Sequence, residues 1–314
     1  MRSLVLAAAS LTLAPPPRSF AQALPASSLA VRPAARDDAP WTEFWRAERA
    51  PVRWDAPHPA VAGAVAWRAL ARGVEAGELA LAGTGEAWRM RAVLVRIDPA
   101  HVRMRLVPGG EPHAPGSGQA WRVEEAPDSA LVAVNAGQFT GSAPWGWVVR
   151  AGLERRPPGR GPLAAAFATD TAGRVRWLRD GEIAPARTSG AVVEAFQSYP
   201  VLLVNGEVPD ALRAPDRGLS VSHRDARLVA CTQRDGRLLL VLTRFDALGE
   251  SFASVPFGPT APETAALAGA LGCQDAVMLD GGISGQLLLR EADGSRRVWR
   301  GWRRVPLGLV ILPR

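Results

Sequence analysis

Lysine is missing from this sequence: all 37 basic side chains among its 314 residues are arginine. The net charge of +7, against 30 acidic residues, would by itself point to an anionic partner. The arginines, however, alternate with Asp and Glu instead of forming a basic stripe, and abundant Ala, Gly and Pro accompany them, as is typical of a GC-rich genome. We therefore predict no nucleic-acid partner, and binding of an anionic polymer is the least favoured function.

Cysteine and histidine are also scarce. Cys231 and Cys273 are the only cysteines, which excludes a disulfide framework and a zinc knuckle. They either form one bridge or remain buried thiols, and the sequence favours neither. The four histidines are isolated from one another, which argues against a histidine metal site.

Long apolar runs are absent as well. No stretch approaches the roughly 20 apolar residues of a membrane span, so we expect no transmembrane segment after signal cleavage. With 47% hydrophobic and 21% charged residues, the composition is that of a globular protein, not of a disordered chain. The length allows one large domain or two ordinary ones, and one domain with appendages is the simpler expectation.

The N-terminus has the pattern of a secretory signal peptide. An early arginine precedes a short apolar stretch, and Ala21 and Ala23 provide small residues for cleavage after Ala23. The alternative, a buried N-terminal helix, would be broken by three consecutive prolines at 15–17. The predicted organisation is a signal peptide at residues 1–23, an N-terminal arm rich in Pro, Ala and Trp at 24–64, and a main domain at 65–314. The predicted location is periplasmic or secreted.

Strand patterns dominate the main domain. Residues 92–97 and 102–107 alternate apolar and polar side chains and predict a hairpin, whereas residues 131–134 and 276–279 are apolar throughout, as in strands buried on both faces. Turns are expected at Ala172-Gly173, Asn205-Gly206 and Asp235-Gly236. A helix is expected over residues 61–72, and a capping box at Thr260–Glu263 begins a second helix that Gly272 ends. The arm resembles a linker with one aromatic anchor at Trp41, Phe44 and Trp45.

Two apolar strands end abruptly in polar, glycine-rich sequence. Asn135 and Gly137 follow the first, and Asp280, Gly281, Gly282 and Ser284 follow the second. A carboxylate after a buried strand is costly to desolvate unless it has a ligand, and paired glycines let backbone N–H groups turn toward an anion. The alternative is a tight turn whose Asp or Asn caps its own backbone.

Two further segments carry polar side chains into strands. Arg224 and Arg227 precede an apolar strand, and their planar forks suit phosphate or carboxylate oxygens, although a surface ion pair with Asp225 is the simpler alternative. Ser198 precedes Pro200 and the turn at Asn205-Gly206, where it could line a cleft.

The order of these motifs resembles the phosphodiester glycosidase family, from about residue 67 to 312. The matching segments are Asn135-Ala-Gly-X-Phe139, Ser198-X-Pro200 with Asn205-Gly206, Arg224-X-X-Arg227, Thr260-X-X-Glu263, Leu271-Gly-Cys273 and Leu279-Asp-Gly-Gly-X-Ser284. Three positions depart from the family pattern: Gln138, Cys231 and Ile283. The resemblance implies a strand-rich α+β domain of mixed sheets with a few packed helices, and hydrolysis of a sugar from a sugar-phosphate diester.

A mechanism follows from these residues as a hypothesis. Arg224 and Arg227 hold the phosphate, the Gly281 and Gly282 N–H groups assist, and Asp280 acts as base or nucleophile. Ser198 and Gly137 contribute to the substrate cleft.

Asn135 and Ser284 would position hydroxyls of the substrate. A second carboxylate, if needed, comes from Glu194, Asp225, Asp246 or Glu263. No metal site is predicted, although Ca²⁺ or Mg²⁺ at Asp280 stays possible. The alternative function is a non-catalytic glycan- or envelope-binding protein, and the sequence does not indicate an oligomeric state.

Overall fold

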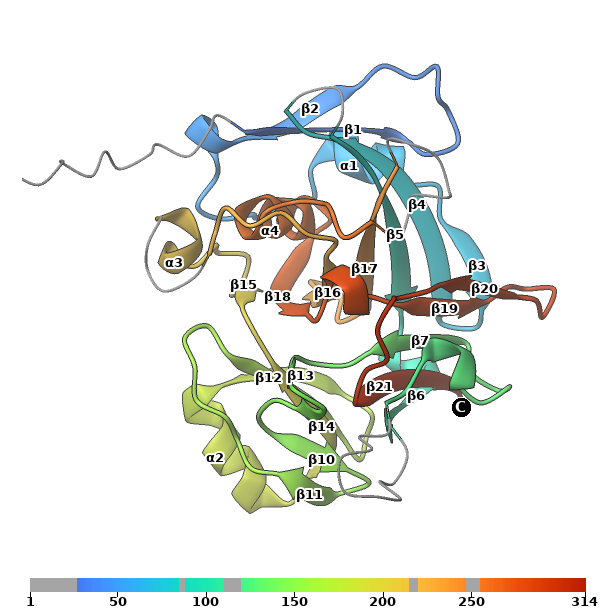
Figure 1. Ribbon diagram of the computed structural model, residues 1–314, viewed down its shortest axis with the longest axis vertical. Helices are drawn as coiled ribbons and strands as arrows, with labels where there is room; N and C mark the ends of the chain where they lie inside the picture. The colour runs from blue at the N-terminus through green and yellow to red at the C-terminus, as the bar shows by residue number, and fades with distance from the viewer. Residues whose placement is uncertain (1–26, 85–87, 110–119, 215–219, 247–254) are drawn as a thin grey trace, which may run out of the picture.

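The computed structural model describes residues 27–84, 88–109, 120–214, 220–246 and 255–314. The expected signal peptide lies outside these residues. Within them the protein is strand-rich, with four sheets of antiparallel strands and four short α-helices, which confirms the expected α+β class (Figure 1).

The largest sheet has nine strands. Their order is β15-β18-β16-β17-β5-β4-β1-β2, and β3 pairs with β4. The bounds are β1 Ser28–Pro33, β2 Thr42–Arg46, β3 Arg68–Ala71, β4 Val74–Ala82, β5 Arg89–Ile97, β15 Val201–Leu203, β16 Leu228–Gln233, β17 Leu238–Phe245 and β18 Cys273–Leu279. One face packs against three helices, and the other face packs against the two five-stranded sheets, so the core has two layers.

The two five-stranded sheets lie below the large one in Figure 1. The first has the order β20-β19-β7-β21-β6, and the second has the order β11-β10-β14-β12-β13. Their bounds are β6 Val102–Pro108, β7 Val132–Asn135, β19 Leu287–Arg290, β20 Arg296–Trp299 and β21 Leu307–Pro313, then β10 Val148–Arg150, β11 Leu153–Arg156, β12 Ala165–Asp170, β13 Val175–Arg179 and β14 Val192–Ser198. The small hairpin of β8 (Phe139–Thr140) and β9 (Ala143–Pro144) follows β7.

The helices are α1 (Pro59–Ala64), α2 (Asp180–Ser189), α3 (Asp210–Arg213) and α4 (Ala261–Ala270). The predicted start of α4 is confirmed: the Thr260 hydroxyl accepts from Glu263 N, and the Glu263 carboxylate accepts from Thr260 N. The helix expected over residues 61–72 is wrong in its second half. The chain leaves α1 at Ala64 and forms β3, because pairing with β4 satisfies its backbone there.

The hairpin expected from residues 92–97 and 102–107 is wrong, although both strands exist. β5 is mostly buried and pairs on its two edges with β4 and β17. The chain then passes through a 3-10 turn, Pro99–His101, and enters β6, which pairs with β21 in another sheet. A central strand has no free edge to offer its sequence neighbour, so tertiary pairing overrode the local pattern.

The N-terminal arm is not a linker over residues 28–46. Its two strands pair with each other, and β1 also pairs with β4, so this part of the arm extends the nine-stranded sheet (Figure 1). The aromatic anchor itself is confirmed for Phe44 and Trp45, which are buried in the core that contains α1 and α4. Trp41 remains partly exposed, with the Arg32 guanidinium 4.5 Å from its ring centroid.

The fold settles the state of the two cysteines and tests the predicted turns. Cys231 and Cys273 form a disulfide. The expected turns are confirmed: Gly173 and Gly236 connect β12 to β13 and β16 to β17, and Asn205 with Gly206 takes the left-handed conformation in a tight turn after β15. The strand β7 is buried along its whole length, as its apolar sequence predicts.

Candidate functional site

The two strand ends singled out in the sequence meet in the structure. Asn135, at the end of β7, is 1% exposed, and its Nδ2 donates to the Asp280 carbonyl at 2.7 Å. Its Oδ1 accepts from Gln286 N at 3.1 Å, and Asp280 N donates to the Gly137 carbonyl at 3.0 Å. These contacts join a strand of one sheet to the end of β18 in another. Because backbone groups use both ends of the Asn135 amide, this side chain is a positioning residue for Asp280.

The Asp280 carboxyl group is the most perturbed acid of this site. Its Oδ2 is buried and has no hydrogen-bond partner among the described residues. Burial raises the pKa of Asp280 to about 6; a hydrogen bond from the Ser284 side chain and the charge of Arg303 oppose this rise, and the charge of Asp225 adds to it. A carboxyl group with such a pKa can exchange a proton near neutral pH, which suits acid–base or nucleophilic chemistry.

The two glycines after Asp280 are required because the segment that contains Asp225 and Ala226 passes very close to them. A side chain at Gly281 would collide with the Ala226 carbonyl, and one at Gly282 would place its Cβ 2.6 Å from Asp225 Oδ2. Gly282 also has a positive φ of 53°, which favours glycine. The Gly282 N–H donates to the Ala226 carbonyl at 2.7 Å, so the expectation that this N–H faces a bound anion is wrong.

Asp225 places a second carboxylate beside the Asp280 loop. Its Oδ1 accepts from Ala226 N at 2.9 Å, and its Oδ2 lies 3.7 Å from His223 Nε2. Burial raises the pKa of Asp225, and the charge of Arg227 is the main opposing effect. The negative charge of Asp225 adds to the rise in the pKa of Asp280, as a nearby like charge does.

The other three carboxylates considered from sequence are engaged elsewhere. Glu194 accepts from two backbone N–H groups, and Asp246 pairs with Arg91. Glu263 caps α4 and forms an ion pair with Arg224. Among the four carboxylate candidates, the structure therefore brings only one to Asp280.

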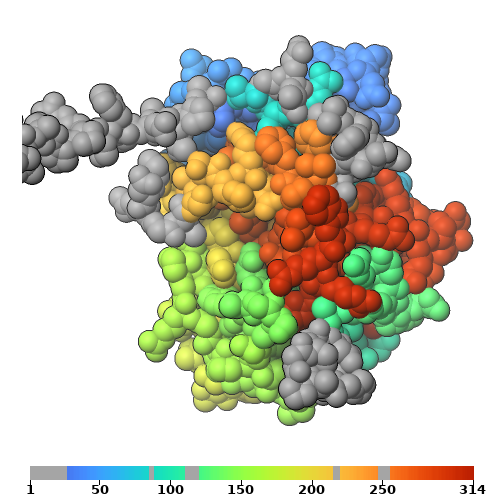
Figure 2. Space-filling model, in the orientation of Figure 1, coloured from blue at the N-terminus to red at the C-terminus, as the bar shows by residue number. Residues whose placement is uncertain are grey.

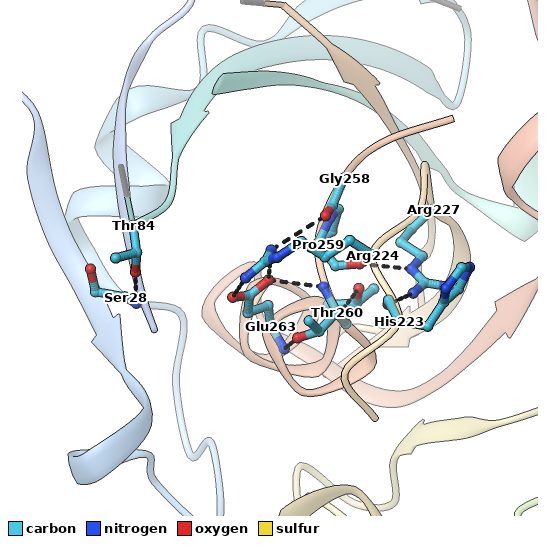
Figure 3. Close-up of polar contacts among 10 residues, drawn as sticks. Ser28, Thr84, His223, Arg224, Arg227, Gly258, Pro259, Thr260 and Glu263 are labelled. Atoms are coloured by element: carbon cyan, nitrogen blue, oxygen red, sulfur yellow. Dashed lines mark hydrogen bonds and ion pairs between the residues drawn. The ribbon is translucent and has the colours of Figure 1, made fainter. Parts of the chain in front are cut away.

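The two arginines of the Arg224-X-X-Arg227 motif anchor the segment that leads into α4 (Figure 3). Both terminal nitrogens of Arg224 donate to the Glu263 carboxylate, at 2.8 and 2.9 Å. Arg227 is 7% exposed, and it donates to the carbonyls of Pro259 and His223.

Arg224 also lines an apolar cavity of about 330 Å³ between the N-terminal arm, α3 and α4. The Glu263 carboxylate already occupies both terminal nitrogens of the Arg224 guanidinium group. The expectation that Arg224 presents these nitrogens to a phosphate is therefore wrong. Arg227 differs from Arg224 in its electrostatic partner, because its charge lowers the pKa of Asp225, which lies beside the Asp280 loop.

Ser198 is fully buried and does not line a cleft. Its hydroxyl donates to the Met278 carbonyl at 2.6 Å, which fixes the end of β14 to β18 two residues before Asp280. Gly137 has a positive φ of 69°, and a Cβ there would lie 2.8 Å from the Gln197 carbonyl. Both residues therefore hold the backbone around Asp280 instead of facing solvent.

Arg303 is the residue that sequence reasoning missed. It is exposed, and its charge lowers the pKa of Asp280 against the effect of burial. Its guanidinium group lies 4.8 Å from the Phe139 ring centroid, and Nη2 donates to the Gly141 carbonyl at 3.0 Å. No local signal distinguishes Arg303 from the other scattered arginines, since only the fold brings residue 303 to residue 280.

Within the part of the chain that the structure covers, no group of three or more His, Cys, Asp or Glu side chains could hold a metal ion. In the same part, no helix has both the length and the apolar character needed to cross a membrane.

Solved structures support the fold. The catalytic domain of zebrafish N-acetylglucosamine-1-phosphodiester alpha-N-acetylglucosaminidase, auto-inhibited by its pro-peptide, is 18% identical, with a TM-score of 0.58, and the match covers 84% of this chain and 92% of that domain. A hypothetical protein from Synechocystis is 16% identical with a TM-score of 0.54, over 83% of this chain and 64% of that one. These similarities show a shared fold.

Sequence comparisons give the family. No curated protein matches the chain significantly. The family model for phosphodiester glycosidases matches residues 128–312, which is more than half of the chain and includes β7, β18 and the Arg303 segment. The chain therefore belongs to the phosphodiester glycosidase family.

Proposed function

We propose that this protein hydrolyses glycosyl phosphodiesters, with Asp280 acting at the anomeric carbon of the sugar. The observation that carries the proposal is the buried, unbonded Asp280 Oδ2 where strands of two sheets end. Leaving a carboxyl oxygen without a partner costs stability, and such costs are concentrated at functional sites. Membership of the phosphodiester glycosidase family is consistent with that role.

In the proposed reaction, water replaces the phosphate on the anomeric carbon. The bond from that carbon to the bridging oxygen breaks, the electron pair leaves with the phosphate, and the products are a free sugar and a phosphate monoester. Asp280 accepts the proton of the attacking water, or first forms the bond to carbon itself as nucleophile. Its pKa of about 6 leaves it mostly ionised at neutral pH, as either role requires.

Arginine stabilises the departing phosphate in this proposal. Arg303 is exposed next to Asp280, and Arg227 lies beside the neighbouring Asp225. A phosphate group is a much better leaving group than a sugar hydroxyl, so neutralising its charge replaces much of the work of a general acid. One catalytic carboxylate then suffices, and Asp225 tunes the proton affinity of Asp280.

We further propose that the protein acts on glycans outside the cytoplasm. The predicted signal peptide at residues 1–23 supports export, and the Cys231–Cys273 disulfide fits an oxidising compartment. The name of the similar zebrafish enzyme gives a starting substrate, a phosphodiester of N-acetylglucosamine.

The decisive experiment compares Asp280→Asn with Asp128→Asn. Asp128 is a matched control because its side chain is fully exposed. On nitrophenyl and UDP-linked sugar phosphodiesters, with and without chelator, we expect Asp280→Asn to lower turnover about 100-fold or more and Asp128→Asn to leave it unchanged. Turnover of Asp280→Asn within a few-fold of the wild type would exclude Asp280 from the chemistry.

Isotope labelling tests the bond that breaks. Hydrolysis in ¹⁸O-water should place the label on the sugar, whereas label in the phosphate would mean attack at phosphorus. Binding of these compounds without any product would favour the glycan-binding alternative. Loss of activity with chelator would show that a divalent cation takes part.

A further inference from the structure

Exposed apolar side chains gather next to the candidate site. Of the four large hydrophobic residues that are exposed within the described ranges, Val52 and Leu153 lie on other segments, whereas Ile283 is 41% exposed and Trp302 is 57% exposed. Trp302 N donates to the Ile283 carbonyl at 2.8 Å, and Arg303 N donates to the same carbonyl at 3.0 Å. Single exposed hydrophobics are ordinary, but two on adjoining segments beside a reactive carboxyl group indicate a binding surface.

We call Trp302 and Ile283 the apolar ledge. Figure 2 shows the red C-terminal residues, which include this region, in the middle of one face of the molecule.

Buried contacts hold the ledge in place. A Cβ at Gly301 would lie 2.9 Å from the Ser284 carbonyl, so the two segments approach as closely as glycine permits. Arg244, which is 7% exposed, donates to the Arg300 carbonyl at 2.9 Å and to the Gly285 carbonyl at 3.5 Å. This buried guanidinium connects the bases of both segments. A ledge held in this way loses little conformational freedom when it binds a ligand.

The charges next to the ledge match the parts of a glycosyl phosphodiester. Such a substrate has an anionic phosphate, an anomeric carbon and a pyranose ring whose C–H face is apolar. Arg303 follows Trp302 directly and acts on Asp280, so a cation and a carboxyl group adjoin the ledge. Arg303 is then the partner of the phosphate, and Asp280 is the partner of the anomeric carbon. The exposed indole of Trp302 is the partner of the apolar face of the pyranose ring.

We propose that Trp302 and Ile283 form a subsite on which the pyranose ring of the substrate stacks. The ligand class is a pyranosyl phosphate, as opposed to a phosphodiester without a ring. This inference rests on the proposed function, because the places of Asp280 and Arg303 define where the ring lies. The ledge would thereby determine specificity, and neither residue would take part in bond breaking.

Binding measurements by calorimetry test the subsite without catalysis. The probes are glucose 1-phosphate and N-acetylglucosamine 1-phosphate, with glycerol 3-phosphate as the ring-free comparison. We expect at least one sugar phosphate to bind about tenfold more tightly than glycerol 3-phosphate, a difference of about 1.4 kcal/mol. Trp302→Ala should remove this difference without changing the affinity for glycerol 3-phosphate, and Trp302→Phe should keep most of it.

Two further variants make the result specific. Leu153→Ala also removes an exposed hydrophobic side chain, and it should retain the full preference for the ring. Arg303→Gln should weaken all three probes alike, because it removes the charge that faces phosphate. The proposal is overturned if the wild type shows no preference for a ring, as a protein- or membrane-binding ledge would, or if Trp302→Ala keeps the preference.

Kinetics separate this inference from the proposed function. If the protein hydrolyses glycosyl phosphodiesters, Trp302→Ala should raise KM about tenfold and change kcat little. Hydrolysis with an unchanged KM would refute the subsite and leave the proposed activity intact. Absence of hydrolysis, together with a ring preference that depends on Trp302, would refute the activity and support the subsite.

Discussion

The strand pair β16–β18 ends differently on its two sides. At one end the Cys231–Cys273 disulfide joins the strands, both cysteines are fully buried, and Gln233 Nε2 donates to the Leu271 carbonyl at 2.9 Å. At the other end lie Asp225 and Asp280, two acids whose pKa values burial raises. The cysteine end is covalently closed, whereas the aspartate end is not. Among the described residues each end leaves one buried side-chain oxygen without a hydrogen-bond partner, Gln233 Oε1 at the first and Asp280 Oδ2 at the second, but only at the second does that oxygen belong to a carboxyl group.

This difference shows how one strand pair can supply both rigidity and reactivity. The disulfide and the core around α4 fix the ladder of β16 and β18, and that ladder sets the distance between the two segments that carry the acids. The unfavourable burial of Asp280 is then tolerated, because the surrounding structure is stable enough to hold it. A change at the cysteine end should therefore lower the free energy of unfolding and leave turnover nearly unchanged. Replacement of Asp280 should instead lower turnover and raise the free energy of unfolding at high pH.

The largest expected effect is at the cysteine end. The double change Cys231→Ser and Cys273→Ser opens a bridge between residues 42 apart, and it should lower the free energy of unfolding by about 4 kcal/mol. Urea titration of wild type and variant measures this loss. Under conditions where the variant is folded, its kcat should stay within a few-fold of wild type. A loss of kcat as large as that of Asp280→Asn would contradict the separation of the two ends.

The next effect is at the aspartate end and has the opposite sign. The pKa of Asp280 is about 6 in the folded protein, above its ordinary 3.8, so the folded state binds the proton more tightly than the unfolded state. The stabilisation is complete below pH 4, and it is lost as the pH rises through 6. Asp280→Asn cannot ionise, so it should exceed the wild type in stability by up to about 3 kcal/mol at pH 8.

Urea titrations of this variant at pH 4 and pH 8 provide the measurement. The two proteins should have nearly equal stability at pH 4, and Asp128→Asn should match the wild type at both values. A variant that is less stable than the wild type at pH 8 would mean that the ionised carboxylate has a favourable partner.

The smallest effect concerns the interaction between the two acids. The charge of Asp225 raises the pKa of Asp280, so Asp225→Asn should move the acidic limb of the kcat/KM profile to lower pH. The profile is measured from pH 4 to 8, with Asp235→Asn as a control at the far end of β16, where Asp235 is part of the turn to β17. An unchanged limb, or one displaced to higher pH, would show that the two carboxyl groups do not interact as described.

Local features of the fold were predictable because their energies act over a few residues. The capping box at Thr260 and Glu263 spans four positions, and the turn at Asp235-Gly236 depends on the conformational freedom of its own two residues. The apolar runs around Val132 and Val277 predicted buried strands correctly. The hairpin of β5 and β6 failed, since strand pairing is decided by partners far along the chain.

The candidate site was predictable in part. Its motifs pointed correctly to Asn135 and Asp280 as neighbours, although they are 145 residues apart. The roles within it were not predictable: Arg224 has its carboxylate partner in α4, whereas Arg303 supplies the charge near Asp280. An arginine has the same local sequence signature whether it anchors a helix or faces a ligand.

The sequence by itself determined the family resemblance, the secondary structure set by turns and caps, and the presence of an acid after a buried strand. Only the tertiary structure decided that Cys231 and Cys273 are bonded, and that Asp225, Arg303 and the Trp302 ledge adjoin Asp280. The reason is physical. Backbone preferences act between near neighbours, whereas burial, pKa and ion pairing depend on every segment that packs around a group, wherever it lies in the chain.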